Sequence, residues 1–305
     1  MKKSFTIFMV LMGMLVAPEL QAIDFAYDAG AEIVSAYVWR GQYNGGLSFQ
    51  PDVEVGFNAV DDVIRFRGGV WASLGASDWK FQKGLPETAD GNPNTYFVPE
   101  LDVLINFSLG GLTLGVTHYY YFGGSPFFNW KKFDPIKGSA GTSQTELSLS
   151  YDFGRKVEIL PLTISWNTMV AGDDLIESDK VAENPDGSPM LDGDGNEIYE
   201  LKRAFSSYVE VRWDQPLPFG LTVSAAIGVS PWASPVYGNS KIALTNLMAK
   251  LNKEWEFDVC TLDLYALGSI NTDHINKTNA YISAAGDDKL YLQKLNGCIG
   301  LGVWF

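Results

Sequence analysis

The chain is short of residues that several functional classes require. It has only two cysteines and two histidines among 305 residues, too few for a zinc site or a disulfide scaffold. Lys and Arg number 22 against 36 Asp and Glu, which gives a net charge of −14, whereas nucleic-acid binding needs a clustered basic surface. We therefore expect no metal, no cofactor and no nucleic-acid partner.

Long apolar runs are also missing. After roughly the first two dozen residues, no apolar run approaches the ~18 residues that a spanning helix needs. Yet 46% of the residues are hydrophobic and 13% are aromatic, which a disordered chain cannot carry. The apolar residues must therefore be distributed in some other way.

The start of the chain has the pattern of an export signal. Two lysines precede an apolar stretch at 5–16, and a short polar segment ends at Ala22 with small or apolar residues at its −3 and −1 places. We expect residues 1–22 to be a cleaved signal peptide and 23–305 to be the mature domain. A membrane anchor is disfavoured because Pro18 closely follows an apolar run of only about 12 residues.

From residue 23 onward, segments of about 10 to 13 residues alternate apolar with polar or small side chains, which is the period of a half-buried strand. In the segment 159–170, for example, the apolar residues share one face and the other face is mostly polar. The predicted strands are 25–40, 49–58, 63–74, 99–109, 112–122, 143–152, 159–170, 204–214, 220–230, 241–256, 260–270 and 294–305.

Short connections between these segments alternate with mostly long ones. The longest loops are 75–98, 123–142, 171–203 and 271–293. This alternation is typical of an all-β, up-and-down antiparallel transmembrane barrel of about 12 strands in a bacterial outer membrane, with tight periplasmic turns and long external loops. A secreted β-sandwich would also alternate, but it tolerates loop lengths in any order.

The segment 34–73 contains Val-Ser-Ala-Tyr-Val-Trp-Arg-Gly-Gln, then Phe-Gln-Pro-Asp, then Gly-Gly-Val-Trp-Ala-Ser. This resembles the TorF family of porins, whose amino-terminal pattern joins a Tyr-x-x-Arg-Gly strand end to a Pro strand and a Gly-x-Trp-x-Ser strand. The resemblance implies an outer-membrane barrel and a porin's compartment rather than a specific activity. The matching positions are Tyr37, Arg40, Gly41, Pro51, Gly69, Trp71 and Ser73.

If the apolar positions of each alternating strand face lipid, the positions between them face the lumen. We call these two sets of alternate positions the outward parity and the inward parity. Counting across the turn at 59–62 places Glu54 opposite Arg67, and rows of Arg and carboxylate would either set a transverse field or simply satisfy one another. The predicted pore-lining residues are Arg40, Asp52, Glu54, Arg65, Arg67, Glu100, Asp102, Glu146, Glu210, Arg212, Lys250 and Asp263.

Twelve strands enclose a narrow interior, so we expect a passive channel for small hydrophilic solutes, with outer-membrane lipid as its other partner. The strand pattern does not determine an oligomeric state. One rival function is a surface binding or adhesion barrel acting through its external loops. The other is a lipid hydrolase using His118, but that residue shares parity with lipid-facing leucines and is typical of an interfacial girdle. We therefore expect no enzyme.

Two further features leave alternatives open. Cys260 has lipid-facing parity and Cys298 has inward parity, so a disulfide would require a bulge near Val259. The acidic loop 171–203 contains Asp-Gly-Asp-Gly-Asn-Glu from residue 192, but its sixth and twelfth places lack the Gly and Glu of an EF-hand. It either binds divalent cations weakly or is a solvated hairpin that repels anions at the pore mouth.

The predicted signal peptide gives the first test. Amino-terminal sequencing of the protein purified from outer membranes should begin at Ile23 with Ile-Asp-Phe-Ala. A mature chain that retains Lys2 and Lys3 would contradict the cleavage site.

Overall fold

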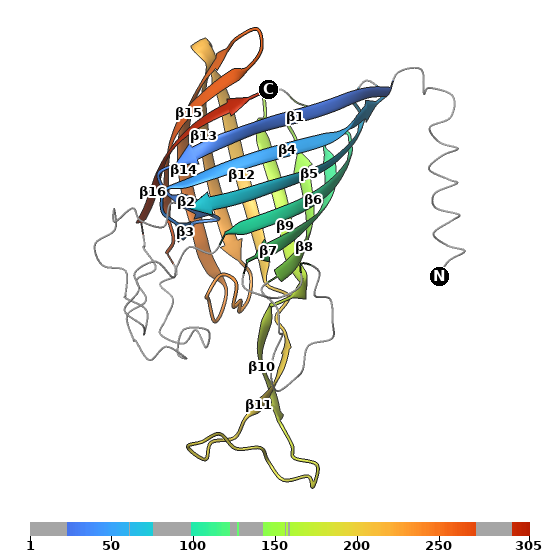
Figure 1. Cartoon of the computed structure of the whole chain (residues 1–305), viewed down its shortest axis with the longest axis vertical. Helices are drawn as coiled ribbons and strands as arrows, with labels where there is room; N and C mark the ends of the chain where they lie inside the picture. Colours follow the sequence, from blue (N-terminus) through green and yellow to red (C-terminus); the bar gives the residue numbers. More distant parts are fainter. Residues whose placement is uncertain are drawn as a thin grey trace.

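The computed structural model describes residues 23–60, 62–75, 99–122, 127, 143–155, 157, 159–272 and 295–305. Twelve strands of the described chain form one closed antiparallel barrel, as Figure 1 shows. The barrel strands are β1 (Ile23–Val34), β4 (Ser48–Ala59), β5 (Ile64–Gly75), β6 (Glu100–Leu109), β7 (Leu112–Tyr121), β8 (Ser143–Asp152), β9 (Leu162–Gly172), β12 (Ser207–Leu217), β13 (Leu221–Ser230), β14 (Ala243–Glu256), β15 (Thr261–Ile270) and β16 (Leu295–Trp304).

The barrel closes because β1 pairs with β4 on one side and with β16 on the other. Every barrel strand therefore has two hydrogen-bonded neighbours, and no edge is left exposed. The predicted twelve-stranded up-and-down barrel is confirmed. In the described residues, the only helical element is the short turn η1 (Pro218–Gly220), and no helix is long and apolar enough to cross a membrane.

The two ends of the barrel differ in their connections. Tight turns join β4 to β5, β6 to β7, β8 to β9, β12 to β13 and β14 to β15, all at what we call the short-turn end. The opposite, long-loop end is the external one in outer-membrane barrels. Three predicted loops, 75–98, 123–142 and 271–293, lie almost wholly outside the described residues.

The distribution of side chains is inverted relative to a water-soluble protein. On β8, Leu147 and Leu149 are 48% and 46% exposed, whereas Glu146 between them and the long-loop end is 2% exposed. Buried polar and charged residues outnumber buried apolar ones across the described chain. An apolar exterior and a polar interior are what a barrel surrounded by lipid requires.

The expected pairing of Glu54 with Arg67 is wrong by two residues. Glu54 lies opposite Gly69, and Arg67 lies opposite Gly56, because the pair nearest the turn is Ala59 with Ile64, whereas the predicted strands would pair residue 58 with residue 63. The Arg67 guanidinium instead donates to the backbone carbonyls of Phe57 and Phe66 and to Asn58 Oδ1 at 2.6 Å.

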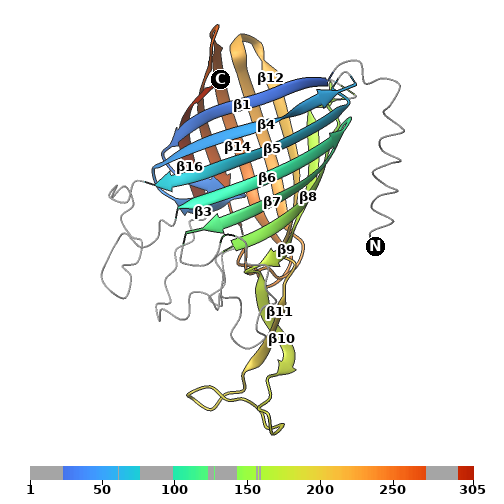
Figure 2. The same ribbon diagram turned by 45° about the vertical axis from the view of Figure 1, so that its right-hand side comes forward.

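The predicted loop 171–203 is more ordered than expected. Its outer part contains β10 (Leu175–Val181) and β11 (Tyr199–Arg203), which pair into an antiparallel hairpin. Figures 1 and 2 show this hairpin projecting from the long-loop end, away from the barrel. We call residues 173–203 the external arm.

The base of the arm is fixed by a buried carboxyl group. Asp174 is fully buried and accepts hydrogen bonds from the backbone NH and the hydroxyl of Ser206, at 3.0 and 2.5 Å. Burial raises the pKa of Asp174, although these two hydrogen bonds oppose the rise. Near the tip, Asp192 accepts from Asn196 within the Asp-Gly-Asp-Gly-Asn turn. No group of three potential metal ligands occurs in the described residues, so weak divalent binding stays a prediction without a site.

The two cysteines are both free thiols. Cys298 is buried on the lumen side, where it packs with Val34 and Ala36. Cys260 follows β14 in the short turn before β15 and is partly exposed. The disulfide considered from the sequence is therefore absent, because Cys298 lies opposite Leu267 of β15, seven residues along the chain from Cys260 in the turn.

The inverted distribution of side chains predicts that a charge on the outward face of β8 destabilises the barrel more than a charge on its lumen face. Leu147→Arg should lower the free energy of unfolding by about 2–4 kcal/mol, because it places a cation in the apolar exterior near mid-height. Ser150→Arg, on the lumen parity of the same strand, should cost much less. Urea unfolding in lipid vesicles measures both, and equal costs would contradict the assignment of faces.

Candidate functional site

The connection between β1 and β4 folds into the barrel as a small hairpin, residues 35–47, which we call the lumen hairpin. Its strands β2 (Tyr37–Trp39) and β3 (Gln42–Gly45) pair antiparallel. The turn is made by Arg40 and Gly41, whose φ angles of 49° and 80° are both left-handed, as in hairpin turns of type I′. The predicted single strand 25–40 is therefore wrong at its end, because β1 stops at Val34 and the chain reverses at Arg40.

The tip of the lumen hairpin packs against distant parts of the barrel wall. Asn296 on β16 donates from Nδ2 to the Gly41 carbonyl at 2.9 Å, and Gln42 Nε2 donates to the Val236 carbonyl at 3.0 Å. A Cβ at position 41 would lie 2.1 Å from the carbonyl oxygen of Thr245 on β14. Only glycine fits this position, because both the positive φ and the close backbone contact exclude a side chain.

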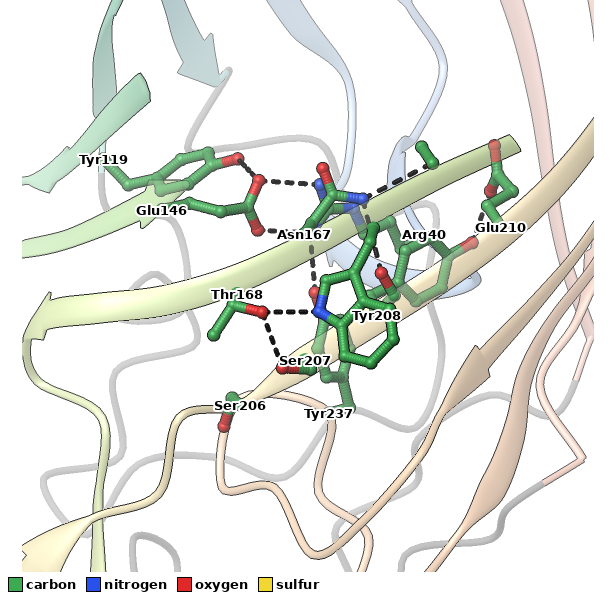
Figure 3. A network of polar contacts seen from close by, with 12 residues as sticks. Arg40, Tyr119, Glu146, Asn167, Thr168, Ser206, Ser207, Tyr208, Glu210 and Tyr237 are labelled. Carbon is green, nitrogen blue, oxygen red and sulfur yellow. Dashed lines mark hydrogen bonds and ion pairs between the residues drawn. The ribbon is translucent and has the colours of Figure 1, made fainter. Parts of the chain in front are cut away.

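Arg40 forms a bidentate ion pair with the opposite wall. Its Nη1 lies 2.5 Å from Glu146 Oε2 and its Nη2 lies 2.8 Å from Glu146 Oε1. Nη1 also donates to the Tyr237 hydroxyl at 2.6 Å, and the Tyr119 hydroxyl donates to Glu146 Oε1 at 3.1 Å. Figure 3 shows these groups pointing toward one another from different elements. Such paired, charge-assisted hydrogen bonds fix both position and orientation.

Aromatic rings enclose the guanidinium. The Trp39 ring stacks on Tyr237 with centroids 5.7 Å apart and meets the edge of Tyr119 at 5.9 Å. The guanidinium carbon of Arg40 lies 4.5 Å from the Trp39 ring centroid and 4.9 Å from that of Tyr208. These contacts exclude water from the ion pair, which strengthens it relative to an exposed pair.

A polar network continues from this cluster around the wall. The Tyr208 hydroxyl donates to Glu210, and Asn246 Nδ2 donates to the Tyr208 hydroxyl at 3.0 Å. Ser269 completes the chain by donating to Asn246 Oδ1 at 2.7 Å. The network links β12, β14 and β15, so connected polar groups rather than isolated ones line the lumen near the long-loop end.

The other predicted pore-lining residues are divided along the barrel axis. Asp52, Glu54, Glu100 and Asp102 occupy the central and long-loop parts of β4 and β6, whereas Arg65 and Arg67 lie toward the short-turn end of β5. The opposed rows expected from the sequence are therefore staggered rather than level, and among the described residues no ion pair joins β5 to β4 or to β6.

A second group of lumen residues lies on β12, β14 and β15. Arg212 pairs with Asp214 on its own strand at 2.9 Å, and both side chains are over a third exposed. Lys250 Nζ lies 3.8 Å from the Tyr265 ring centroid, and the Tyr265 hydroxyl donates to Glu32 at 3.1 Å. Asp263 lies on β15 opposite Glu254.

Sequence reasoning missed the aromatic half of this site. Trp39 falls near the end of the predicted strand 25–40 but belongs to the lumen hairpin, because β1 ends before it. Tyr208 shares strand parity with Glu210, so the alternation already contained its inward position. Tyr237 lies in the loop between β13 and β14, where no periodicity exists to indicate a direction.

His118 lies on the outward parity of β7, as expected, but it is buried under Phe127. Its Nδ1 lies 2.9 Å from the Thr145 hydroxyl and its Nε2 lies 2.7 Å from the Phe127 carbonyl. Both nitrogens are thus engaged in contacts that fix the ring at the outer rim.

No protein-family model matches the chain, and no curated protein matches its sequence. Among solved structures, the COG4313 outer membrane channel from Pseudomonas putida F1 shares 11% identity with a TM-score of 0.45, over 94% of this chain and 97% of that one. The Pseudomonas putida toluene transporter TodX shares 12% identity with a TM-score of 0.34, over 96% and 92%. OmpF of Salmonella typhi, in complex with daunomycin, shares 9% with a TM-score of 0.36, over 93% and 97%.

The class of the protein follows from its own architecture. A closed antiparallel barrel with an even number of strands, tight turns at one end and an apolar exterior is a β-barrel of the bacterial outer membrane. In this barrel, a hairpin folds into the lumen and is held there by an arginine.

The ion pair predicts how firmly the lumen hairpin is held. Arg40→Ala leaves the Glu146 carboxylate buried without its cation. Removing one partner of a buried ion pair typically lowers the free energy of unfolding by about 3–5 kcal/mol. We expect hydrogen exchange of the backbone amides in residues 36–46, followed by mass spectrometry in detergent, to accelerate strongly. The Arg40→Ala/Glu146→Ala double variant should lose less protection than the two single losses added together.

Arg212→Ala is the matched control, because its ion pair with Asp214 is over a third exposed and surface pairs contribute only about 0–1 kcal/mol. Exchange in the lumen hairpin should be unchanged in this variant. Equal protection in Arg40→Ala and in the unmodified protein would show that the ion pair does not hold the hairpin.

Proposed function

We propose that the protein is a channel for the passive diffusion of small hydrophilic solutes across the outer membrane, and that the lumen hairpin is its constriction. The observation that carries this proposal is the Arg40–Glu146 ion pair, which ties the hairpin tip to the wall strand β8 across the lumen. A segment held in this way narrows the solute path through the lumen near the long-loop end, independently of the external loops.

The chemistry of the lumen supports polar cargo. Carboxylates, amides, hydroxyls and basic side chains line it, and each can replace part of the hydration shell of a passing solute. Because Arg40 neutralises Glu146, the constriction itself contributes little net charge, and the remaining carboxylates of β4 and β6 set the sign of the field near it.

We also propose kinship with the TorF family, on the ground that the resembling residues meet in space. Arg40 and Gly41 form the turn of the lumen hairpin. Tyr37 at its base contacts the Trp71 ring of β5 at 5.4 Å between centroids. A Cβ on Gly69 would lie 2.7 Å from the Glu54 side chain, so a larger residue would displace that carboxylate. The motif is thus explained as a lumen hairpin together with the wall on which it rests.

Single-channel recording with purified protein in planar bilayers tests the channel and its constriction together. Val34 and Ser48 pair in register, so residues 35–47 can be replaced by Asn-Gly, a two-residue turn that suits adjacent antiparallel strands. We expect measurable conductance in KCl for the unmodified protein and a severalfold higher conductance for this excised variant.

A shortened external arm provides the matched control. Ala182 and Ile198 are hydrogen-bonded at 2.7 Å, so residues 184–196 can also be replaced by a short turn, and conductance should not change. Silence of both the unmodified and the excised protein in every salt would refute the channel. Equal conductance of the two would refute the constriction.

A further inference from the structure

Two buried carboxyl groups on β6 take no part in the Arg40 ion pair. Glu100 and Asp102 are 3% and 8% exposed, and they face the lumen near the long-loop end. The Glu100 carboxyl has side-chain hydrogen bonds with Tyr37, Tyr121 and Asp102. The ion pairs found among the described residues use Arg40, Lys180 and Arg212, and none of them reaches β6.

A carboxyl pair in contact needs either a shared proton or a cation beside it, because two adjacent carboxylates repel each other. Asp102 leaves one oxygen, Oδ1, buried and without a hydrogen-bond partner in the described part of the chain. Leaving a buried acceptor unpaired costs free energy, so this atom marks a place where a donor or a cation is favourable.

Aromatic rings surround the two carboxyl groups. Across β5, β6 and β7, Trp71, Asp102 and Tyr119 are register neighbours, and Tyr121 is the register neighbour of Glu100. Tyr37 of the lumen hairpin lies over the Trp71 ring, with centroids 5.4 Å apart. The carboxyl groups therefore lie among four rings contributed by the wall strands β5 and β7 and by the lumen hairpin.

This combination selects one class of ligand. Carboxylate oxygens attract any cation, but aromatic faces favour organic ammonium groups, which have a large, weakly hydrated surface. A metal ion would need at least three suitable ligands, and no group of three His, Cys, Asp or Glu residues with that geometry occurs in the described chain.

We propose that Glu100 and Asp102, with Trp71 and Tyr37, form a subsite for the ammonium group of a small organic cation beneath the lumen hairpin. This subsite rests on the proposed channel function and names the solute class that the channel favours. The cation would lie beside the two hydrogen-bonded carboxyl groups and against the Trp71 ring, where it would supply the missing partner of Asp102 Oδ1.

Choline chloride is the probe. In planar bilayers, choline added at the long-loop side should block the KCl current of the unmodified protein. Glu100→Gln/Asp102→Asn should raise the half-blocking concentration by about tenfold or more, equivalent to about 1.4 kcal/mol of binding free energy. Trp71→Leu, which keeps both charges, should raise it by roughly threefold or more, the contribution of a partly shielded cation–π contact.

The matched control removes the same two charges elsewhere in the lumen. Asp28 and Glu54 are register partners on β1 and β4, so Asp28→Asn/Glu54→Gln alters the lumen field equally without touching the aromatic rings. Its half-blocking concentration should stay within about twofold of the unmodified protein. Equal shifts in both double variants, or no block by choline in a conducting protein, would overturn the subsite and leave the channel standing.

Isothermal titration calorimetry of choline into the detergent-solubilised full chain separates the subsite from the channel. Binding that disappears in Glu100→Gln/Asp102→Asn and persists in Asp28→Asn/Glu54→Gln supports the subsite even if the barrel shows no conductance. Absence of choline binding to the unmodified protein overturns it, and circular dichroism confirms that each variant retains the folded barrel.

Discussion

The structure depends on one constraint: a backbone amide or carbonyl group in hydrocarbon has no water to bond with, so the sheet must satisfy its own hydrogen bonds. Closure meets that constraint, because β1 pairs with both β4 and β16 and no barrel strand keeps a free edge. Closure also divides each strand into a lipid face and a lumen face. The alternation of exposed leucines with buried polar residues on β8 is the direct consequence.

A polar lumen in turn creates a second problem, since buried polar groups need partners. The lumen hairpin answers it near the long-loop end: its turn carbonyl at Gly41 accepts from Asn296, and Arg40 neutralises Glu146. The lumen hairpin is therefore an integral part of the polar interior, because it supplies partners to buried polar groups of the wall. Its stacking between Tyr237 and Tyr119 through Trp39 makes the position of the arginine specific.

The charge distribution depends on the same arrangement. Carboxylates of β6 lie beside the hairpin, while the arginines of β5 lie farther toward the short-turn end, where Arg67 bonds to backbone carbonyls. A two-residue difference in strand register accompanies this separation. Parity counting put Arg67 on the lumen face, but its level relative to Glu54 depended on which residues pair next to the turn, Ala59 with Ile64, and alternation does not encode that choice.

The sequence alone predicted the class of fold: twelve strands with nearly correct bounds, the sorting of short and long connections, and the alternation of two faces along each strand. A two-residue period is a local property, so it can be read without knowing neighbours. Tertiary structure decided what Arg40 does, because the partners that hold the inward-folded Arg-Gly turn are Glu146 and Asn296 on wall strands and Tyr237 in a loop, all far away in sequence. Those long-range partners exist only once the barrel has closed.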